Sequence, residues 1–234
     1  QQSTPQKRAP QVWDLKLGQH AAELPRGEFA DFACGTMGGP PSLPLEDWLD
    51  YRKCPAEAAS GLHEVQFRYD DELEYRSLAH RIEIPATRFG STTVYGFPVV
   101  VSGLFDARGF LRGLRIVTDP RGLDAETRQL GISLWNFFRG RFGTDPWTCD
   151  DLPVAEGEQA LGGQLLKRRC QKPADAGAQQ VAIEGHYYRK RGQAAVDPHT
   201  RLGTEGQFES TVRAEILLAG EIADAEQRLA AVAA

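Results

Sequence analysis

Residues 94–118 read VYGFPVVVSGLFDARGFLRGLRIVT, and no other part of the chain indicates one structure so clearly. The two arms, residues 94–105 and 110–118, are rich in β-branched and aromatic residues, which favour strands. The connection Asp106-Ala107-Arg108-Gly109 puts glycine where a type I turn followed by a bulge needs a positive φ angle. The segment therefore predicts a β-hairpin.

The neighbouring segments predict further strands and several helices. Polar and apolar residues alternate with a period of two in the expected strands, whereas leucines and phenylalanines recur at helical spacing in the longest expected helix. We expect strands at 62–69, 180–191 and 206–218, and helices at 17–24, 124–142 and 221–234. Strands grouped in hairpins with helices between them predict an α+β fold, a mostly antiparallel sheet of hairpins packed with two or more helices.

The order helix, cysteine, loop, cysteine, strand occurs twice along the chain. It suggests a leader at 1–11, an N-terminal α+β half at 12–121 and a C-terminal α+β half at 122–234. One continuous domain is the alternative. The leader is polar and contains prolines, as a mature N-terminus does after a signal peptide has been removed.

The four cysteines favour an oxidising compartment. Three pairings are open from the count alone. We favour Cys34 with Cys54 and Cys149 with Cys170, because each pair would close one local loop rich in proline and glycine. Zinc binding is the rival, but the chain has no C-x-x-C spacing. We therefore expect disulfide-stapled loops in a periplasmic or secreted protein.

Charge and hydropathy exclude some classes of partner. The formal net charge is -5, which gives no electrostatic reason to bind nucleic acid. The longest apolar runs are far shorter than the roughly 20 residues that a membrane-spanning helix needs. We expect no nucleic-acid partner and no transmembrane segment.

Standard catalytic signatures are absent from the sequence: it contains no G-x-S-x-G, H-E-x-x-H, Walker loop or dinucleotide fingerprint. His63 and His186 both stand near the start of an expected strand, in corresponding places of the two halves. If those strands were neighbours, the two histidines and nearby carboxylates would meet in one pocket and supply acid–base catalysis. Isolated strand histidines with local hydrogen bonds are the simpler interpretation.

An acidic run and two basic runs offer other sites. The run Asp70, Asp71, Glu72 and Glu74 has the oxygen ligands that calcium prefers, although it lacks the alternating D-x-D-x-D-G loop. Aromatic and basic residues that adjoin one another could bind an anion; these are Tyr187, Tyr188, Arg189, Lys190 and Arg191. Residues 166–172 form the second basic run. If the two runs bind no anion, we expect them to be a solvated loop and a charged sheet edge.

Residues 14–25, DLKLGQHAAELP, resemble the helix-opening phrase of BamE-like (SmpA/OmlA) envelope modules, and the whole chain resembles uncharacterised exported bacterial proteins. The resemblance implies a small periplasmic fold of two helices against an antiparallel sheet, used in assembly and protein contacts. The chain departs from these modules because it lacks their lipid-anchor cysteine.

We expect a non-enzymatic exported binding or accessory protein that needs no cofactor and has an envelope protein or a small ligand as its partner. Two alternatives remain: a periplasmic hydrolase that uses His63 or His186, and a metal-ion-binding protein that uses the run at residues 70–74.

Overall fold

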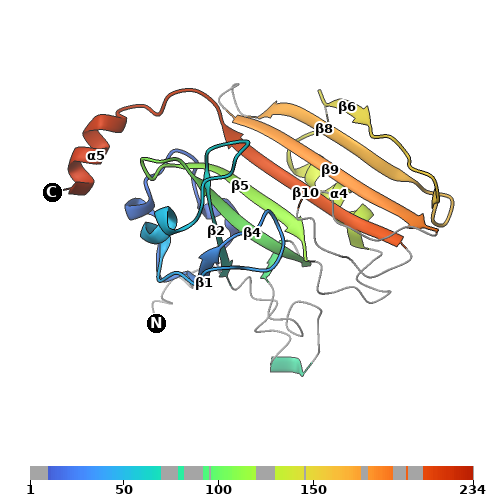
Figure 1. Ribbon diagram of the computed structural model, residues 1–234, viewed down its shortest axis with the longest axis horizontal. Coiled ribbons are helices and arrows are strands. Elements are labelled where there is room, and N and C mark those ends of the chain that lie inside the picture. The colour runs from blue at the N-terminus through green and yellow to red at the C-terminus, as the bar shows by residue number, and fades with distance from the viewer. Residues whose placement is uncertain are drawn as a thin grey trace, which may run out of the picture.

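One large antiparallel β-sheet dominates the computed structural model, which describes residues 10–69, 79–81, 92–94, 96–119, 130–144, 146–174, 179–191, 199 and 208–233. The sheet has ten strands in the described residues, and the strand order along its main path is β1-β2-β4-β5-β10-β9-β8-β6 (Figure 1). The short strands β3 and β7 pair with β4 and β9. The strands are β1 (Phe29–Cys34), β2 (His63–Tyr69), β3 (Thr92–Val94), β4 (Phe97–Phe105), β5 (Leu111–Thr118), β6 (Thr148–Asp151), β7 (Glu158–Gln159), β8 (Leu166–Ala174), β9 (Gln179–Lys190) and β10 (Phe208–Leu218).

Helices are short and few in the described part of the chain. They are the 3-10 helices η1 (Val12–Asp14), η2 (Ala21–Glu23) and η3 (Trp48–Lys53), and the α-helices α4 (Leu130–Arg141) and α5 (Ala225–Ala233). The helix expected at 17–24 shrinks to the single turn of η2, since Gly18 has a positive φ of 88° and Pro25 follows directly.

The expected α+β class is wrong, because the sheet, rather than a balance of helix and sheet, makes up most of the fold. Several strands fall where the sequence predicted loops. The clearest is β8, which contains the basic run at 166–172. Its lysine and arginines pair with carboxylates of neighbouring strands, so a charged sequence is accommodated inside the sheet: Lys167 with Glu158, Arg168 with Asp151 and Arg169 with Glu184.

Both expected hairpins are confirmed. β4 and β5 pair in antiparallel register, and Gly109 in their connection has a φ of 91°. β9 and β10 pair over eleven positions, from Phe208 opposite Arg189 to Leu218 opposite Gln179. β10 also pairs with β5, so the sheet runs without a break through both segments of the chain, 12–121 and 122–234.

One face of the sheet carries the hydrophobic core. Side chains of directly paired residues project from the same face, so Phe67, Val101, Ile116, Ala214 and Ile183 form one apolar row from β2 to β9. Helix α4 covers this face at β9 and β10. Burial of an apolar row on a covered face is the main stabilising term of such a layer.

Two close contacts position the helices that cover the core. The ring of Trp135 in α4 lies where a side chain on Gly185 would begin, 2.6 Å from that point, so glycine is needed there. At the other end of the sheet, the fully buried Trp48 of η3 makes edge contacts with Phe32 and Phe67.

The two predicted disulfides are confirmed: Cys34 is bonded to Cys54 and Cys149 to Cys170. The second one joins β8 to β6, the exposed strand at the end of the main path. Among the described helices, none combines the length and the apolar character that a bilayer crossing requires.

Helix α5 lies beyond the end of the sheet (Figure 1). It packs on a small apolar cluster that is separate from the main core and contains Phe110, Ile222 and Ala225. An ion pair between Arg228 and Glu23 ties it to η2.

Candidate functional site

The face of the sheet opposite the core carries rows of charged residues. In the first row, Arg213 of β10 lies opposite Glu184 of β9, which lies opposite Arg169 of β8. In the second, Glu215 of β10 lies opposite Arg115 of β5. Paired residues on one face have Cβ atoms about 5 Å apart, so charges of opposite sign alternate across the middle of the sheet.

Arg115 is the centre of the second row and only 4% of it is exposed. Its Nη1 lies 2.5 Å from Glu57 Oε1 and 3.0 Å from Glu64 Oε2, and its Nε donates to Glu215 Oε1 at 2.8 Å. Burial alone would lower the pKa of Arg115, but the hydrogen bond to Glu57 and the charges of Glu64 and Glu215 raise that pKa above its ordinary value. One guanidinium therefore contacts carboxylates from three segments of the chain.

Glu184 is the centre of the first row and 7% of it is exposed. Its Oε1 accepts hydrogen bonds from Nε2 of His186 at 2.8 Å and Nε2 of His199 at 3.1 Å. Its Oε2 accepts from Nε and Nη2 of Arg169. Burial works to raise the pKa of the Glu184 carboxyl, but these hydrogen bonds outweigh it and hold that pKa far below its usual range.

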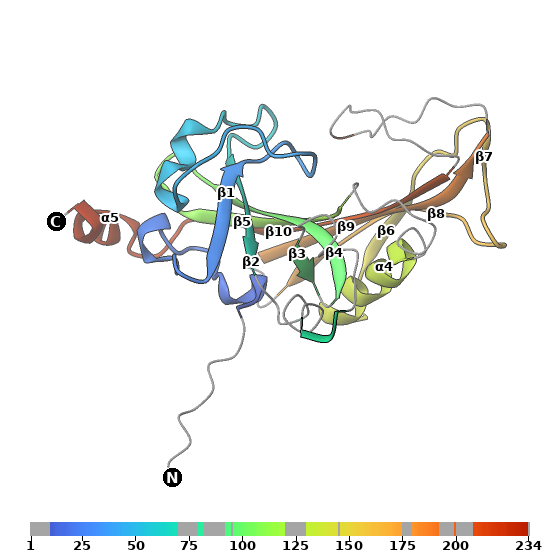
Figure 2. The ribbon, with the colours of Figure 1, turned by 90° about the horizontal axis from the view of Figure 1, so that it is seen from below.

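Two loops lie over this charged face, and the Cys34–Cys54 disulfide ties their starting points together. The loop after β1 carries Met37, and the loop after η3 carries Glu57. Figure 2 shows the loop after β1 on one side of β9 and β10 and α4 on the other. The charged face is thus covered by irregular backbone that a covalent bond holds in place.

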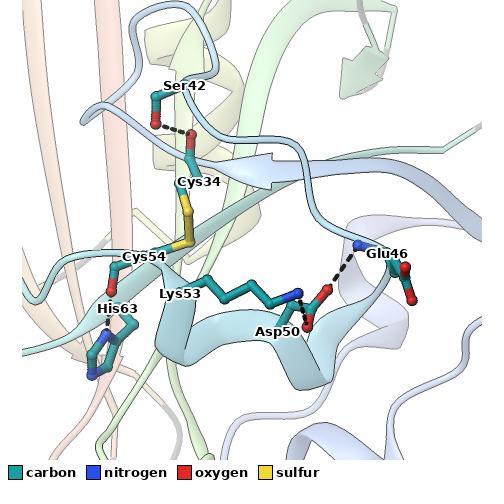
Figure 3. Close-up of a disulfide and its surroundings, with 7 residues drawn as sticks. All are labelled: Cys34, Ser42, Glu46, Asp50, Lys53, Cys54 and His63. Carbon is teal, nitrogen blue, oxygen red and sulfur yellow. Dashed lines mark hydrogen bonds and ion pairs between the residues drawn. A yellow bond between two sulfur atoms is a disulfide. The ribbon is translucent and has the colours of Figure 1, made fainter.

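Hydrogen bonds fix the ends of both loops around the disulfide (Figure 3). Ser42 Oγ donates to the Cys34 carbonyl at 3.2 Å, and Nδ1 of His63 donates to the Cys54 carbonyl at 2.7 Å. Within η3, the ammonium of Lys53 lies 2.8 Å from the Asp50 carboxylate. Hydrogen bonds therefore hold the backbone on both sides of the disulfide.

The loop after β1 is pinned to the charged face by Met37. Its N–H donates to Glu64 Oε2 at 2.7 Å, and its carbonyl accepts from Nη1 of Arg213 at 2.6 Å. Gly35 permits this close approach, because a side chain there would begin 2.3 Å from the Glu64 carboxyl carbon. The backbone of this loop thereby becomes one wall of a cleft.

The cleft has a volume of about 370 Å³, within the range typical of small-molecule sites. Charged side chains line it in balanced number, three arginines and three glutamates, together with His199 and several leucines. The lining residues are Met37, Glu57, Ala59, Ser60, Leu62, Leu104, Arg115, Arg169, Gln171, Ala182, Ile183, Glu184, His199, Arg213, Glu215 and Leu217.

Arg213 has one nitrogen without a partner in this cleft. Its Nε donates to Glu215 Oε1 at 2.9 Å and its Nη1 to the Met37 carbonyl, but the buried Nη2 has no hydrogen-bond partner. Only 9% of Arg213 is exposed. A buried donor left unpaired costs about 1–3 kcal/mol, and a ligand acceptor in the cleft would recover that free energy.

The structure does not bring His63 and His186 together. Directly paired residues share a face: His63 pairs with the core residue Phe105, whereas His186 follows Glu184 on the charged face. The two histidines thus project from opposite sides of the sheet. His186 does have a nearby carboxylate, that of Glu184, so a hydrolase that uses His186 alone stays a prediction.

The aromatic and basic run at 187–191 is divided between the two faces. Tyr188 and Lys190 are buried on the charged face, where Lys190 pairs with Glu209 and the Lys167 ammonium lies over the Tyr188 ring at 5.4 Å. Arg189 and Arg191 are exposed, and Tyr187 is half-buried on the opposite face from Tyr188. The run does not form one anion site, although Tyr188 and Lys190 extend the charged rows.

Asp70, Asp71, Glu72 and Glu74 lie outside the described residues. Within the described residues, no group of three or more histidine, cysteine, aspartate or glutamate side chains is arranged to hold a metal ion. The expectation of a calcium site at 70–74 stays a prediction.

No sequence motif marks the residues that make the cleft, above all Arg115, Glu184 and Arg213. Each stands between apolar residues in a strand, as Arg115 does between Leu114 and Ile116. A buried charge in the middle of a strand that is expected to lie inside a sheet needs a partner. That signal could have indicated an ion-pair network, but not which strands are neighbours.

The cleft carboxylates make the stability of the fold depend on pH. The pKa of Glu184 and that of Glu215 are both lowered in the folded chain. For Glu215, burial works to raise the pKa, but the charges of Arg115 and Arg213 outweigh that effect. Their stabilisation is complete above the unfolded carboxyl pKa of about 4.3 and is lost as the pH falls toward the folded values.

We expect the free energy of unfolding of the wild type to fall below about pH 5. In Glu184→Gln, which cannot ionise, the fall is smaller, so the difference from the wild type is largest at pH 7 and narrows toward pH 3. Urea denaturation from pH 3 to 7 measures it. Parallel pH curves would contradict an ionised, stabilising Glu184.

No family model, curated protein or solved structure matches the chain. The resemblance of residues 14–25 to BamE-like modules stays a prediction. The structure defines an antiparallel sheet protein with a charged cleft beneath disulfide-tied loops.

Proposed function

We propose that this protein is an exported, non-enzymatic binding protein that holds a small ligand in the cleft over β10 and β9. The observation that carries the proposal is a cleft of about 370 Å³ lined by Arg213, a residue whose buried Nη2 has no hydrogen-bond partner. The two disulfides support a periplasmic or secreted location, because such bonds persist in oxidising compartments.

The protonation states of the cleft favour binding over catalysis. A general acid or base works best when its pKa lies near the operating pH. The pKa values of Glu184 and Glu215 are lowered, so they lie further from a neutral operating pH than those of ordinary glutamates. Their arginine partners hold them as fixed anions, an arrangement that suits a preformed recognition site.

A thermal-shift screen tests this proposal. The panel contains acetate, octanoate, inorganic phosphate, the twenty amino acids, glucose and spermidine, each added in excess to the intact, oxidised chain. A ligand that binds only the folded state raises the melting temperature, and the added stability grows with the logarithm of its concentration over its Kd. We expect at least one compound to do so, and a flat response to the whole panel would overturn the proposal.

Two variants locate the binding in the cleft. Ala182 lies on the cleft wall beside Glu215, so Ala182→Leu fills the space without removing a charge and is expected to abolish the thermal shift. Ala30→Leu, the same change at an exposed position of β1, is the control and keeps it. Arg213→Lys keeps the charge but loses Nη2, and about a tenfold weaker affinity is expected from a lost charge-assisted hydrogen bond. A shift that survives Ala182→Leu would place the binding elsewhere.

A further inference from the structure

The two ends of the cleft differ in chemistry. At one end, Arg213, Glu184 and Arg169 stand side by side on three strands. The Glu184 carboxylate already accepts four hydrogen bonds, two from histidines and two from Arg169, whereas Arg213 keeps a buried donor nitrogen without an acceptor. The unused capacity at this end is therefore that of a donor, and it requires an acceptor from the ligand.

The charge balance of the lining selects among acceptors. Glu57, Glu184 and Glu215 lie near any bound anion, and all three are already paired: Glu57 with Arg115, Glu184 with Arg169, and Glu215 with Arg115 and Arg213. A second negative charge on the ligand would face these carboxylates with no further arginine to balance it. The planar fork of a guanidinium also matches a carboxylate well. A monocarboxylate therefore fits better than phosphate, which carries more than one negative charge near neutral pH.

The other end of the cleft contains its three leucines, with Ser60 beside Leu62. Gly113 of β5 has no side chain, and the space above it is occupied by Leu217 of β10 and Leu104 of β4: a Cβ there would begin 2.5 Å from Leu217 Cδ2 and 3.2 Å from Leu104 Cδ1. Leu62, just before β2, lines the same cleft. These leucines offer the ligand a hydrocarbon surface and no hydrogen-bonding side-chain group.

The donor end and the leucine end are separated along a single strand. Arg213, Glu215 and Leu217 are alternate residues of β10, so their side chains project from the same face. Four residues at roughly 3.3 Å each give about 13 Å between Arg213 and Leu217. A ligand that uses both ends must be elongated, with its charge at one tip.

We propose that the cleft binds an amphipathic monocarboxylate, whose carboxylate accepts from Nη2 of Arg213 and whose hydrocarbon chain lies along β10 toward Leu217, Leu104 and Leu62. This inference rests on the proposed binding function and names its ligand class. It also explains why a charged face of the sheet has leucines at one end of its cleft.

Isothermal titration with a series of probes tests the ligand class. The series is acetate, butyrate, hexanoate and octanoate, with octylamine as the probe of equal chain length and opposite charge, and inorganic phosphate as the probe without a chain. Burial of each methylene contributes about fourfold in affinity, so the Kd should fall at each step from acetate to octanoate until the leucines are covered. Octylamine and phosphate are expected to bind at least tenfold more weakly than octanoate.

A matched pair of variants assigns the chain to the leucine end. Leu217→Gln should remove most of the gain from butyrate to octanoate and leave the Kd of acetate unchanged. Leu165→Gln, at a leucine that is 41% exposed on the loop before β8, should leave the whole series unchanged. Circular dichroism and melting temperature establish that both variants are folded.

The outcomes separate the ligand class from the binding function. Equal affinity for acetate and octanoate, equal affinity for octylamine and octanoate, or a chain-length gain that survives Leu217→Gln overturns the amphipathic monocarboxylate. If none of the acids binds while another compound of the thermal-shift panel does, this inference fails and the binding function stands. If nothing in the panel binds, both fail.

Discussion

Replacing Arg115 with methionine is expected to lower the free energy of unfolding by about 3–5 kcal/mol at pH 7, measured by urea denaturation. The guanidinium contacts Glu57, Glu64 and Glu215, and the side chain of Glu64 is only 4% exposed. Methionine has a similar length but no charge, so Glu57 and Glu64 would lose this counter-charge on the covered face, and Glu215 would keep only its ion pair with Arg213. Removing one partner of a buried ion pair is costly because the other partner stays desolvated.

The pH dependence of Arg115→Met distinguishes this cause from a loss of packing. The charge of Arg115 helps to lower the pKa of Glu215 in the folded chain, and Arg115→Met removes that contribution, so the loss of stability is full at pH 7 and shrinks as the pH falls. A control is Arg168→Met on β8, whose partner Asp151 is 73% exposed; that change should cost far less stability than Arg115→Met. A deficit for Arg115→Met that does not change with pH would contradict the electrostatic explanation.

The double replacement Cys34→Ser with Cys54→Ser is expected to have the second large effect, a loss of about 3 kcal/mol together with loss of ligand binding. The stability term follows from the sequence separation of 20 residues that the bond closes. The binding term follows from the two loops that begin at these cysteines: one carries Met37, which accepts from Arg213, and the other carries Glu57, which pairs with Arg115.

The second disulfide supplies a matched control. Cys149 and Cys170 are 21 residues apart, so Cys149→Ser with Cys170→Ser should cost nearly the same stability. The cleft residues of β8, Arg169 and Gln171, are held by the pairing of β8 with β9, so binding should survive. Titration of octanoate, or of whichever panel compound binds, into both oxidised double variants measures this difference. An equal effect of the two replacements on binding would show that the loops after Cys34 and Cys54 do not form the cleft.

Local sequence signals were sufficient for the hairpins and the disulfides. The turn at 106–109 and the alternation along 206–218 are decided by neighbours in the sequence, and both hairpins are present. The signals failed where strand character depends on distant partners. β8 contains four positive charges in 166–172 and resembles a solvated loop until the carboxylates of Glu158, Asp151 and Glu184 are placed beside it. The fold class was wrong for this reason.

The cleft could not be predicted from the sequence for a related reason. His63 and His186 occupy similar places in the sequence, and their positions suggested a shared pocket. Strand order and register decide which faces meet, and a shift of one residue in register would move a side chain to the other face. The network around Arg115 joins three segments that are far apart in the sequence, so its members are apparent only when the sheet is assembled.

The separate packing of α5 has a consequence for the cooperativity of unfolding. The helix rests on a small cluster around Phe110 and on its ion pair with Glu23, whereas the strands share one large core. Regions with few apolar contacts open at a lower free energy than the strands of a core. The last helix can therefore fray and re-form while the sheet beneath the cleft keeps its register, and none of the cleft-lining residues belongs to that helix.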